Sequence, residues 1–287
     1  MKKIICGTSE LAVFALFWLS GTVLLGQADQ GPNRFRLPME LYEVSGLVVS
    51  GQDSLWWHND GGNAAELFLT NRAGQLLQQI PLPLQNYDWE DLTHDDKGNL
   101  YLGDFGDNRR NREVLKIYKY NPKTGVVDSL SFSYQNGQKH DTEAFLWHQD
   151  TFHLFTKSRI KRADLVTYHY VVPAHGGQQT AILRDSLSLR KRAVTAAAIH
   201  PETGTVALLA YYYTRRLGFI PYSAANVYFF EDYPDGRFLQ GRRQSRRISF
   251  LVATQYESLD FLNSEELLVA SERTLFIKAK AKRIRRR

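Results

Sequence analysis

The chain of 287 residues contains a single cysteine, Cys6, which lies in the N-terminal segment. The rest of the chain has no thiol, which excludes disulfide bonds, cysteine-ligated zinc and a cysteine nucleophile. The sequence also lacks the Gly-x-Ser-x-Gly, His-Glu-x-x-His and Gly-x-x-x-x-Gly-Lys patterns. The signatures of α/β-hydrolases, zinc proteases and P-loop enzymes are therefore absent.

No amphipathic helical pattern follows the N-terminal segment, which argues against alternating strands and helices around a parallel sheet. Short apolar or alternating runs are instead separated by turn residues such as Gly, Asn and Asp. This pattern predicts an all-β fold.

The first 28 residues have the pattern of a secretory signal peptide. Lys2 and Lys3 precede an apolar run over 11–25, and Gly26-Gln27-Ala28 follows it. We expect cleavage after Ala28, a linker over 29–33, and export to the periplasm or the medium. The alternative is an uncleaved anchor, but Ser20-Gly21 interrupts the run, which is short for a span of about 20 residues. After cleavage no transmembrane span is expected.

Charge is concentrated at the C-terminus. The formal net charge is +6, and residues 278–287 alone carry seven lysines and arginines. The remaining body is close to neutral, so we expect no nucleic-acid partner. Residues 281–287 are interpreted as a basic tail, either solvated or in contact with an anionic surface such as lipid or polysaccharide.

Five similar units recur along the chain. Each begins with a short strand, a tight turn and a second strand, and we align the units on Gly46, Asp91, Ala144, Ala198 and Ser258. A second hairpin follows in the first four units. Four strands per repeat of about 40–50 residues are typical of a β-propeller blade.

The fifth unit has only three strands, the last expected at 274–279. The segment 35–41 precedes the first unit and can supply the missing outer strand, where Pro38 is acceptable. Closing the ring in this way protects strand edges. We therefore predict one propeller domain over 34–280 with five four-stranded blades, or six if the long loops of the fourth unit hide another.

Polar residues gather where each unit enters its first strand and leaves its second. In a propeller these two places surround the same mouth of the central channel. The residues predicted to line this mouth are Glu43, His58, Asn59, Asp60, Asn108, Asp141, Glu143, Lys157, Glu257, Glu272 and Arg273. The fourth unit has Thr195 and alanines there, and no acid.

We predict that the mouth binds a divalent cation, with Glu90, Asp91, Asp104 and Asp107 as its ligands. Converging carboxylates repel one another unless their pKa values rise, a base pairs with them or a cation binds. Oxygen ligands favour Ca²⁺ or Mg²⁺, and Ca²⁺ is our assignment. The alternative is that these acids cap strand ends and pair locally.

Several motifs resemble one known group of proteins. They are 43–47 (EVSGL), 59–63 (NDGGN), 88–92 (DWEDL), 103–108 (GDFGDN), 141–144 (DTEA) and 256–259 (YESL). Together they resemble exported bacterial β-propeller proteins akin to the phytase-like and gluconolactonase (SMP-30)-like propellers. The resemblance implies a calcium-binding propeller. Gly61 stands where that group has serine, and no nucleophile is implied.

Two functions remain open from the sequence. The first is metal-assisted hydrolysis of a phosphoester or lactone, with a mouth carboxylate as base and no catalytic residue identified. The second is a non-catalytic binding or scaffold propeller for a small molecule, a glycan, a peptide or a cell-envelope partner. We expect a monomer in either case.

Overall fold

The computed structural model describes residues 31–157, 165–216, 220–250, 254–274 and 277–286. The predicted signal peptide and the first two residues of the predicted linker lie outside these ranges. Within them there is no helix long and apolar enough to cross a membrane. The described residues form β-strands and three short 3-10 helices, so the all-β prediction is confirmed.

The strands fall into five groups of four. The first group is β2 (Val44–Ser50), β3 (Ser54–Asn59), β4 (Glu66–Thr70) and β5 (Leu76–Pro81), and the second is β6 (Trp89–His94), β7 (Leu100–Asp104), β8 (Leu115–Tyr120) and β9 (Val127–Tyr134). The third is β10 (Thr142–His148), β11 (Thr151–Thr156), β12 (Val166–Pro173) and β13 (Gly177–Ser188). The fourth is β14 (Ala193–Ile199), β15 (Val206–Arg216), β16 (Ile220–Glu231) and β17 (Arg242–Phe250). The last is β18 (Tyr256–Asn263), β19 (Glu266–Ser271), β20 (Lys280–Arg285) and β1 (Arg34–Arg36).

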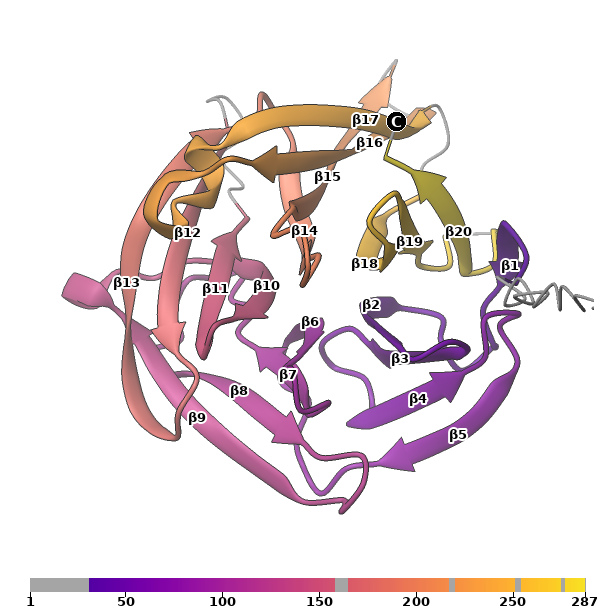
Figure 1. Cartoon of the computed structure of the whole chain (residues 1–287), viewed down its shortest axis with the longest axis horizontal. Helices are drawn as coiled ribbons and strands as arrows, with labels where there is room; N and C mark the ends of the chain where they lie inside the picture. Colours follow the sequence, from indigo (N-terminus) through magenta and orange to yellow (C-terminus); the bar gives the residue numbers. More distant parts are fainter. Residues whose placement is uncertain (1–30, 158–164, 217–219, 251–253, 275–276, 287) are drawn as a thin grey trace, which may run out of the picture.

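The groups are arranged around a central axis, with β2, β6, β10, β14 and β18 innermost (Figure 1). Neighbours within each group are antiparallel. A parallel pairing of β9 with β13 joins the second and third groups into one eight-stranded sheet. Five apolar clusters fill the space between neighbouring groups, for example Trp57 and Phe68 with Leu268. The 3-10 helices η1 (Gln135–Gly137), η2 (Pro234–Gly236) and η3 (Phe238–Gln240) lie in loops.

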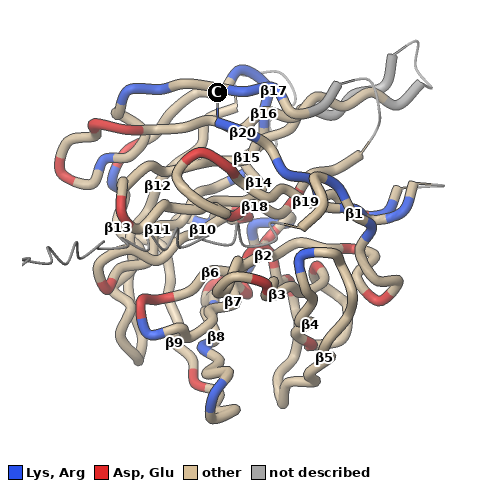
Figure 2. The backbone as a smooth tube through the Cα atoms, turned by 45° about the vertical axis from the view of Figure 1, so that its right-hand side comes forward, with Lys and Arg blue, Asp and Glu red and all other residues tan. Residues whose placement is uncertain are grey.

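The N-terminal strand closes the last group, but through a different partner from the one expected. β1 pairs with β20 at Lys280–Arg285, whereas the described residues of 274–279 form no named strand: Thr274 and Ile277 form an isolated bridge, and the carbonyl of Ala279 accepts from the N–H of Leu37 at 3.0 Å. The prediction of a free basic tail from 281 is therefore wrong. Ala281 and Ile284 are buried on opposite faces of β20, in two different apolar clusters. Between them, Lys282 donates to the carbonyl of Ile248, and Arg283 forms an ion pair with Glu266 at 3.6 Å. Figure 2 shows the Lys and Arg residues along β20 and at β1.

Each innermost strand has an irregularity near its start. The register shifts between Val44 and Gly46, and the other four innermost strands shift at the equivalent place. In the fourth group the shift lies between Val194 and Ala196, so Ala196, not Ala198, is the structural equivalent of Gly46. A bulge adds one residue to a strand and redirects its side chain. The bulged positions are Ser45, Glu90, Glu143, Thr195 and Glu257, with Asp91 sharing the shift in β6.

Candidate functional site

Backbone hydrogen bonds bring the start of each innermost strand next to the end of the second strand. The N–H of Asp60 donates to the carbonyl of Glu43 at 2.8 Å, and that of Lys157 donates to Asp141 at 2.7 Å. Gly106 donates to Asp88 at 3.1 Å in the second group. The two sets of polar residues therefore meet at one end of the central channel, as the repeat predicted.

The bulged residues divide into two kinds. Ser45 donates to the carbonyl of Glu90, and Thr195 donates to the carbonyl of Tyr256 at 2.8 Å, so these hydroxyls tie neighbouring innermost strands together. The other three bulges carry glutamates, all buried: Glu90, Glu143 and Glu257. The absence of an acid in the fourth unit is confirmed at Thr195.

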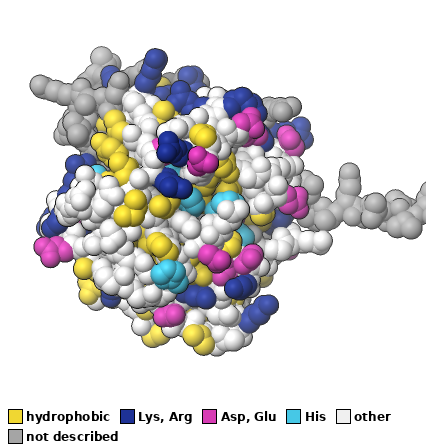
Figure 3. All heavy atoms as spheres, turned by 60° about the vertical axis from the view of Figure 1, so that its left-hand side comes forward, with side chains coloured by type: hydrophobic (Ala, Val, Ile, Leu, Met, Phe, Trp, Pro, Cys, Tyr) yellow, Lys and Arg dark blue, Asp and Glu magenta, His cyan; other side chains and the backbone are white. Residues whose placement is uncertain are grey.

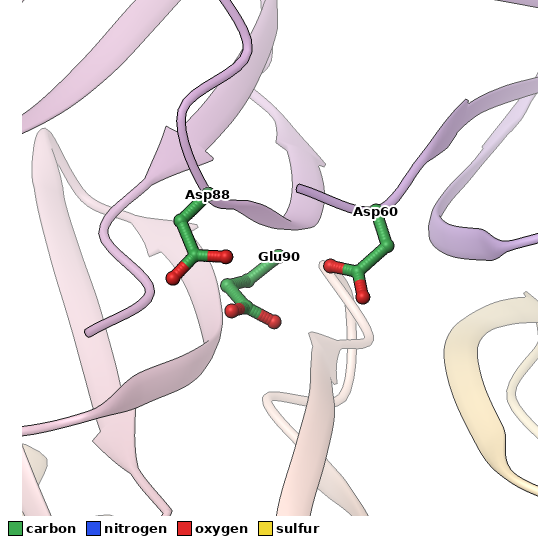
Figure 4. Close-up of side chains that lie close together, drawn as sticks. All are labelled: Asp60, Asp88 and Glu90. Atoms are coloured by element: carbon green, nitrogen blue, oxygen red, sulfur yellow. The ribbon is translucent and has the colours of Figure 1, made fainter. Parts of the chain in front are cut away.

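Two overlapping groups of carboxylates could each hold a metal ion. Asp60, Asp88 and Glu90 form one, and Glu90, Asp141 and Glu143 form the other. Within each group one oxygen per residue lies within 4.8 Å of the others. Figure 4 shows the first group, in which side chains from the end of β3, the loop before β6, and β6 itself turn toward one another. Glu90 belongs to both.

Crowding and burial disfavour ionisation of these acids. Burial, together with Glu257, Glu143 and Asp88, raises the pKa of Asp60 to about 8. Burial, with Glu143 and Asp141, raises the pKa of Asp88 to about 6. The pKa of Glu90 is raised well above its ordinary value by burial and by Glu143 and Asp60. A bound divalent cation would lower all three values.

Lys157 partly neutralises the cluster. Its ammonium group, buried at the end of β11, forms an ion pair with Glu143. Burial opposes its charged form, but Glu143 and the neighbouring acids raise its pKa well above the ordinary value. Across the mouth, burial and Asp60 raise the pKa of Glu272 to about 7. Within the part of the chain that the structure describes, Lys157 therefore lies among several carboxylates.

Two glycines make room for the carboxylates. A Cβ on Gly106 would lie 2.1 Å from Oε1 of Glu90 and 2.5 Å from the carboxyl of Asp88. A Cβ on Gly61 would lie 2.4 Å from Oδ1 of Asp88. Gly61, which departs from the serine of the similar group, therefore has a steric reason here.

Of the four predicted metal ligands, Glu90 alone belongs to these groups. Asp91 is fully buried and accepts hydrogen bonds from the N–H groups of Leu92, Phe145 and Ala197, at 2.9, 3.1 and 3.1 Å. It thus links the innermost strands β6, β10 and β14. The sequence prediction did not separate this structural aspartate from its neighbour Glu90, because the bulge that points them in different directions is a tertiary feature.

Asp104 and Asp107 also have other partners. Asp104 accepts from Arg112 at 2.9 Å and from the N–H of Asp88 at 3.2 Å. Asp107 accepts from the N–H groups of Asn111 and Arg112 at 3.0 and 2.9 Å, which stabilises the following loop. These contacts are of the kind described by the alternative of capping and local pairing, and among the described residues Oδ2 of Asp104 is buried without a hydrogen-bond partner.

The remaining predicted mouth residues are dispersed. His58 is fully buried and packs edge-to-face on Trp89, with ring centroids 5.6 Å apart, and it belongs to neither group of carboxylates. Asn59 donates to the carbonyl of Glu40 at 2.7 Å. Glu43 accepts from Asn63 at 2.8 Å. Arg273 lies over the ring of Tyr42, and Asn108 is exposed.

Asp88 belongs to a candidate metal group, and the site prediction omitted it. It precedes β6 directly, in the same motif as Glu90, and its carbonyl accepts from Gly106. Its position at the start of an innermost strand was the available signal.

A pocket of about 830 Å³ adjoins the acids. Asp88 and Gly106 form its border with them, and its other walls include the exposed ring of Tyr87, the amides Asn108 and Asn111, and the bases Arg109 and Lys116. Arg112 also lines it, but its guanidinium is held by Asp104 and by the carbonyl of Gly106 at 2.9 Å. The pocket therefore offers amide, aromatic and cationic contacts beside the carboxylates.

No family model and no curated protein matches this chain. Among solved structures it is similar to a GH43 β-1,3-galactosidase, with 7% identity, a TM-score of 0.53, and coverage of 89% of this chain and 59% of the other. It is also similar to a gluconolactonase from Xanthomonas campestris, with 10% identity, a TM-score of 0.43, and coverage of 90% of this chain and 88% of the other. An α-L-arabinanase from Penicillium chrysogenum has 9% identity, a TM-score of 0.49, and coverage of 88% of this chain and 98% of the other. These structures are β-propellers, and the likeness concerns the fold.

Proposed function

We propose that this chain is an exported five-bladed propeller that binds Ca²⁺ at its acidic mouth and uses that site to hydrolyse a phosphoester or a lactone. Each group of four strands counts as one blade. The observation that carries the proposal is the sharing of Glu90 between two groups of closely spaced carboxylates, in one of which Glu143 pairs with Lys157.

The donor set fits a hard cation. Asp60, Asp88, Glu90 and Asp141 offer oxygen atoms only, and flexible oxygen coordination suits Ca²⁺ better than softer metals. When bound, the cation would polarise a phosphoryl or carbonyl oxygen and lower the pKa of a coordinated water.

The residues around the cation would have separate tasks. A mouth carboxylate outside the donor set, with Glu272 as the first candidate, could accept a proton near neutral pH, because its pKa of about 7 matches that task. Lys157 holds Glu143 in place and limits repulsion within the cluster. Arg109 and Lys116, in the adjoining pocket, would attract an anionic substrate.

Calcium binding is tested by titration calorimetry of chelator-treated protein and by thermal melting in chelator and in a Ca²⁺ series. The parent should bind in a saturable way, and Glu90→Gln should lose most of the affinity. Glu202→Gln is the matched control, because Glu202 is exposed in the turn between β14 and β15. Equal Ca²⁺ affinity in the parent and Glu90→Gln would refute the site.

Catalysis is tested separately with a panel of lactones and phosphoesters, in Ca²⁺ and in chelator. Turnover that requires Ca²⁺ and is lost in Glu90→Gln supports the hydrolase. Calcium binding without turnover on any of these substrates would support the metal site but refute the proposed hydrolysis.

The second candidate is a binding propeller for a glycan. It is favoured by Tyr87, whose ring is 58% exposed beside the amides of Asn108 and Asn111. Exposed aromatic rings and amides are suited to stacking on and hydrogen bonding with sugars. Retention on a glycan array that is lost in Tyr87→Ala, without turnover, would support this candidate.

A further inference from the structure

A second polar cluster lies away from the mouth, across three strands of the third group. His153 on β11, His169 on β12 and Asp185 on β13 form a buried chain of hydrogen bonds. Nδ1 of His153 lies 2.9 Å from Nε2 of His169, and Nδ1 of His169 lies 2.8 Å from Oδ1 of Asp185. The second oxygen of Asp185 accepts from the N–H of Leu239 at 3.0 Å.

Aromatic packing fixes the rings of this chain. His169 stacks between Phe155 and Phe238, with ring centroids 4.9 and 5.1 Å away and interplanar angles of 16° and 11°. His153 stacks on Phe238 at 4.4 Å. The histidines therefore cannot rotate without disturbing the packing of η3 against the sheet.

The hydrogen bonds determine which nitrogen carries each proton. Asp185 accepts from Leu239 with one oxygen, so its other oxygen accepts the Nδ1 proton of His169. Neutral His169 then has a lone pair on Nε2, which accepts the Nδ1 proton of His153. Neutral His153 consequently has a lone pair on its own Nε2. Burial lowers the pKa values of both histidines, which favours these neutral forms.

The chain ends at a pocket of about 730 Å³. His153 and His148 both line it, together with Tyr233, Arg184 and Asp235. His148 ends β10, is half-buried, and has its ring centroid 6.3 Å from that of His153. Figure 3 shows histidine side chains reaching the surface on the side of the molecule that includes this group of strands.

We propose that His153 and His148 form a binding site for a borderline transition-metal ion such as Zn²⁺, Ni²⁺ or Cu²⁺, with Asp185 and His169 as positioning residues. Neutral imidazole is a preferred ligand of these ions, and a ligating histidine usually donates its other N–H to a fixed acceptor, as His153 does to His169. Two imidazoles on one ion, with metal–nitrogen distances of about 2.0–2.1 Å, have ring centres roughly 5 Å apart. The ring centroids of His148 and His153 are 6.3 Å apart, and a small rotation of His148 would shorten this separation to that value. The pocket leaves the other coordination positions of the ion open.

The site is independent of the acidic mouth, which offers oxygen ligands. The test uses tag-free, chelator-treated full chain in excess Ca²⁺, titrated with Zn²⁺ or Ni²⁺ by calorimetry. Cu²⁺ binding is followed by electron paramagnetic resonance, in which ¹⁴N ligands add superhyperfine splitting to the copper signal and carboxylate oxygens do not. We expect one site with two nitrogen ligands. His148→Gln and His153→Gln should each weaken binding at least tenfold, while His175→Gln, in an exposed turn, should not.

Asp185→Asn separates positioning from packing. Its oxygen would accept from Leu239, and its NH₂ would donate to Nδ1 of His169, which reverses the tautomer of both histidines and places a proton on Nε2 of His153. We expect roughly 10–100-fold weaker binding, with the reversed tautomer visible in the ¹⁵N shifts of His153. Oxygen-only Cu²⁺ spectra, or unchanged affinity in the half-buried His148→Gln, would overturn the proposal even if other variants misfold.

Discussion

Replacing Asp60 with asparagine should stabilise the metal-free protein and reduce the stabilisation that Ca²⁺ binding provides. The carboxyl of Asp60 lies in the acidic mouth, and its pKa is raised from 3.8 to about 8 by burial and by Glu257, Glu143 and Asp88. The folded state therefore holds a proton that the unfolded chain releases near pH 4. Between these two pH values the folded protein binds more protons, so its stability falls as pH rises from about 4 toward 8.

The magnitude follows from the size of this shift. At pH 7 a single group with these two pKa values costs up to about 4 kcal/mol of unfolding free energy. The side chain is partly exposed, and the neighbouring acids Glu90 and Glu272, whose pKa values are also raised, can hold the proton in its place. We therefore expect Asp60→Asn to gain about 1–2 kcal/mol without a cation. At this chain length that is roughly 2–8 °C in melting temperature. The asparagine can still accept from the N–H of Gly61, as Asp60 does at 2.7 Å.

Thermal melts at pH 7.5 in chelator and in saturating Ca²⁺ test this prediction. Calcium at a hundred times its Kd should stabilise the parent by about 2.7 kcal/mol and the variant by much less. The order of stability should therefore reverse: the variant melts higher in chelator and the parent melts higher in Ca²⁺. Asp96→Asn, at an exposed turn, is the control, and its melting temperature should match that of the parent both in chelator and in Ca²⁺. A variant that melts lower than the parent in chelator would refute the electrostatic reasoning.

Three further perturbations follow from the same structure. Asp91→Ala leaves three buried N–H groups without their acceptor and should lower the free energy of unfolding by about 3–5 kcal/mol. Urea unfolding measures this change, and a loss below about 1 kcal/mol would contradict the role of Asp91 as a bridge between strands. Gly106→Ala pushes a methyl group into the carboxyl of Glu90 and should weaken Ca²⁺ binding at least tenfold by calorimetry, with Gly176→Ala, whose surroundings are open, as a control for the backbone change. Deleting residues 280–287 removes β20 from between β19 and β1 and should abolish cooperative unfolding by circular dichroism; a chain that still melts cooperatively would show that β20 is dispensable.

The repeat pattern predicted the all-β fold, the grouping of strands and the closure by an N-terminal strand. These features follow from local signals, namely turn residues and apolar spacing, which repeat in each unit. The strand β20 was missed because its lysines and arginines dominate its composition. Of its described positions, Ala281 and Ile284 are buried, on opposite faces of the strand, and the pairing with β19 and β1 appears only in the folded structure.

The sequence by itself determined that acids would gather at one end of the channel, because the chain enters and leaves its inner hairpins at the same face in every unit. It could not say which acids converge. That was decided by the bulges of the innermost strands, which place Glu90 with Asp60 and Asp88 but place Asp91 among backbone N–H groups. The tertiary structure also brought His153, His169 and Asp185 into one chain from three strands. Adjacent residues in sequence can point to different sides of a strand, and distant ones meet only through strand pairing.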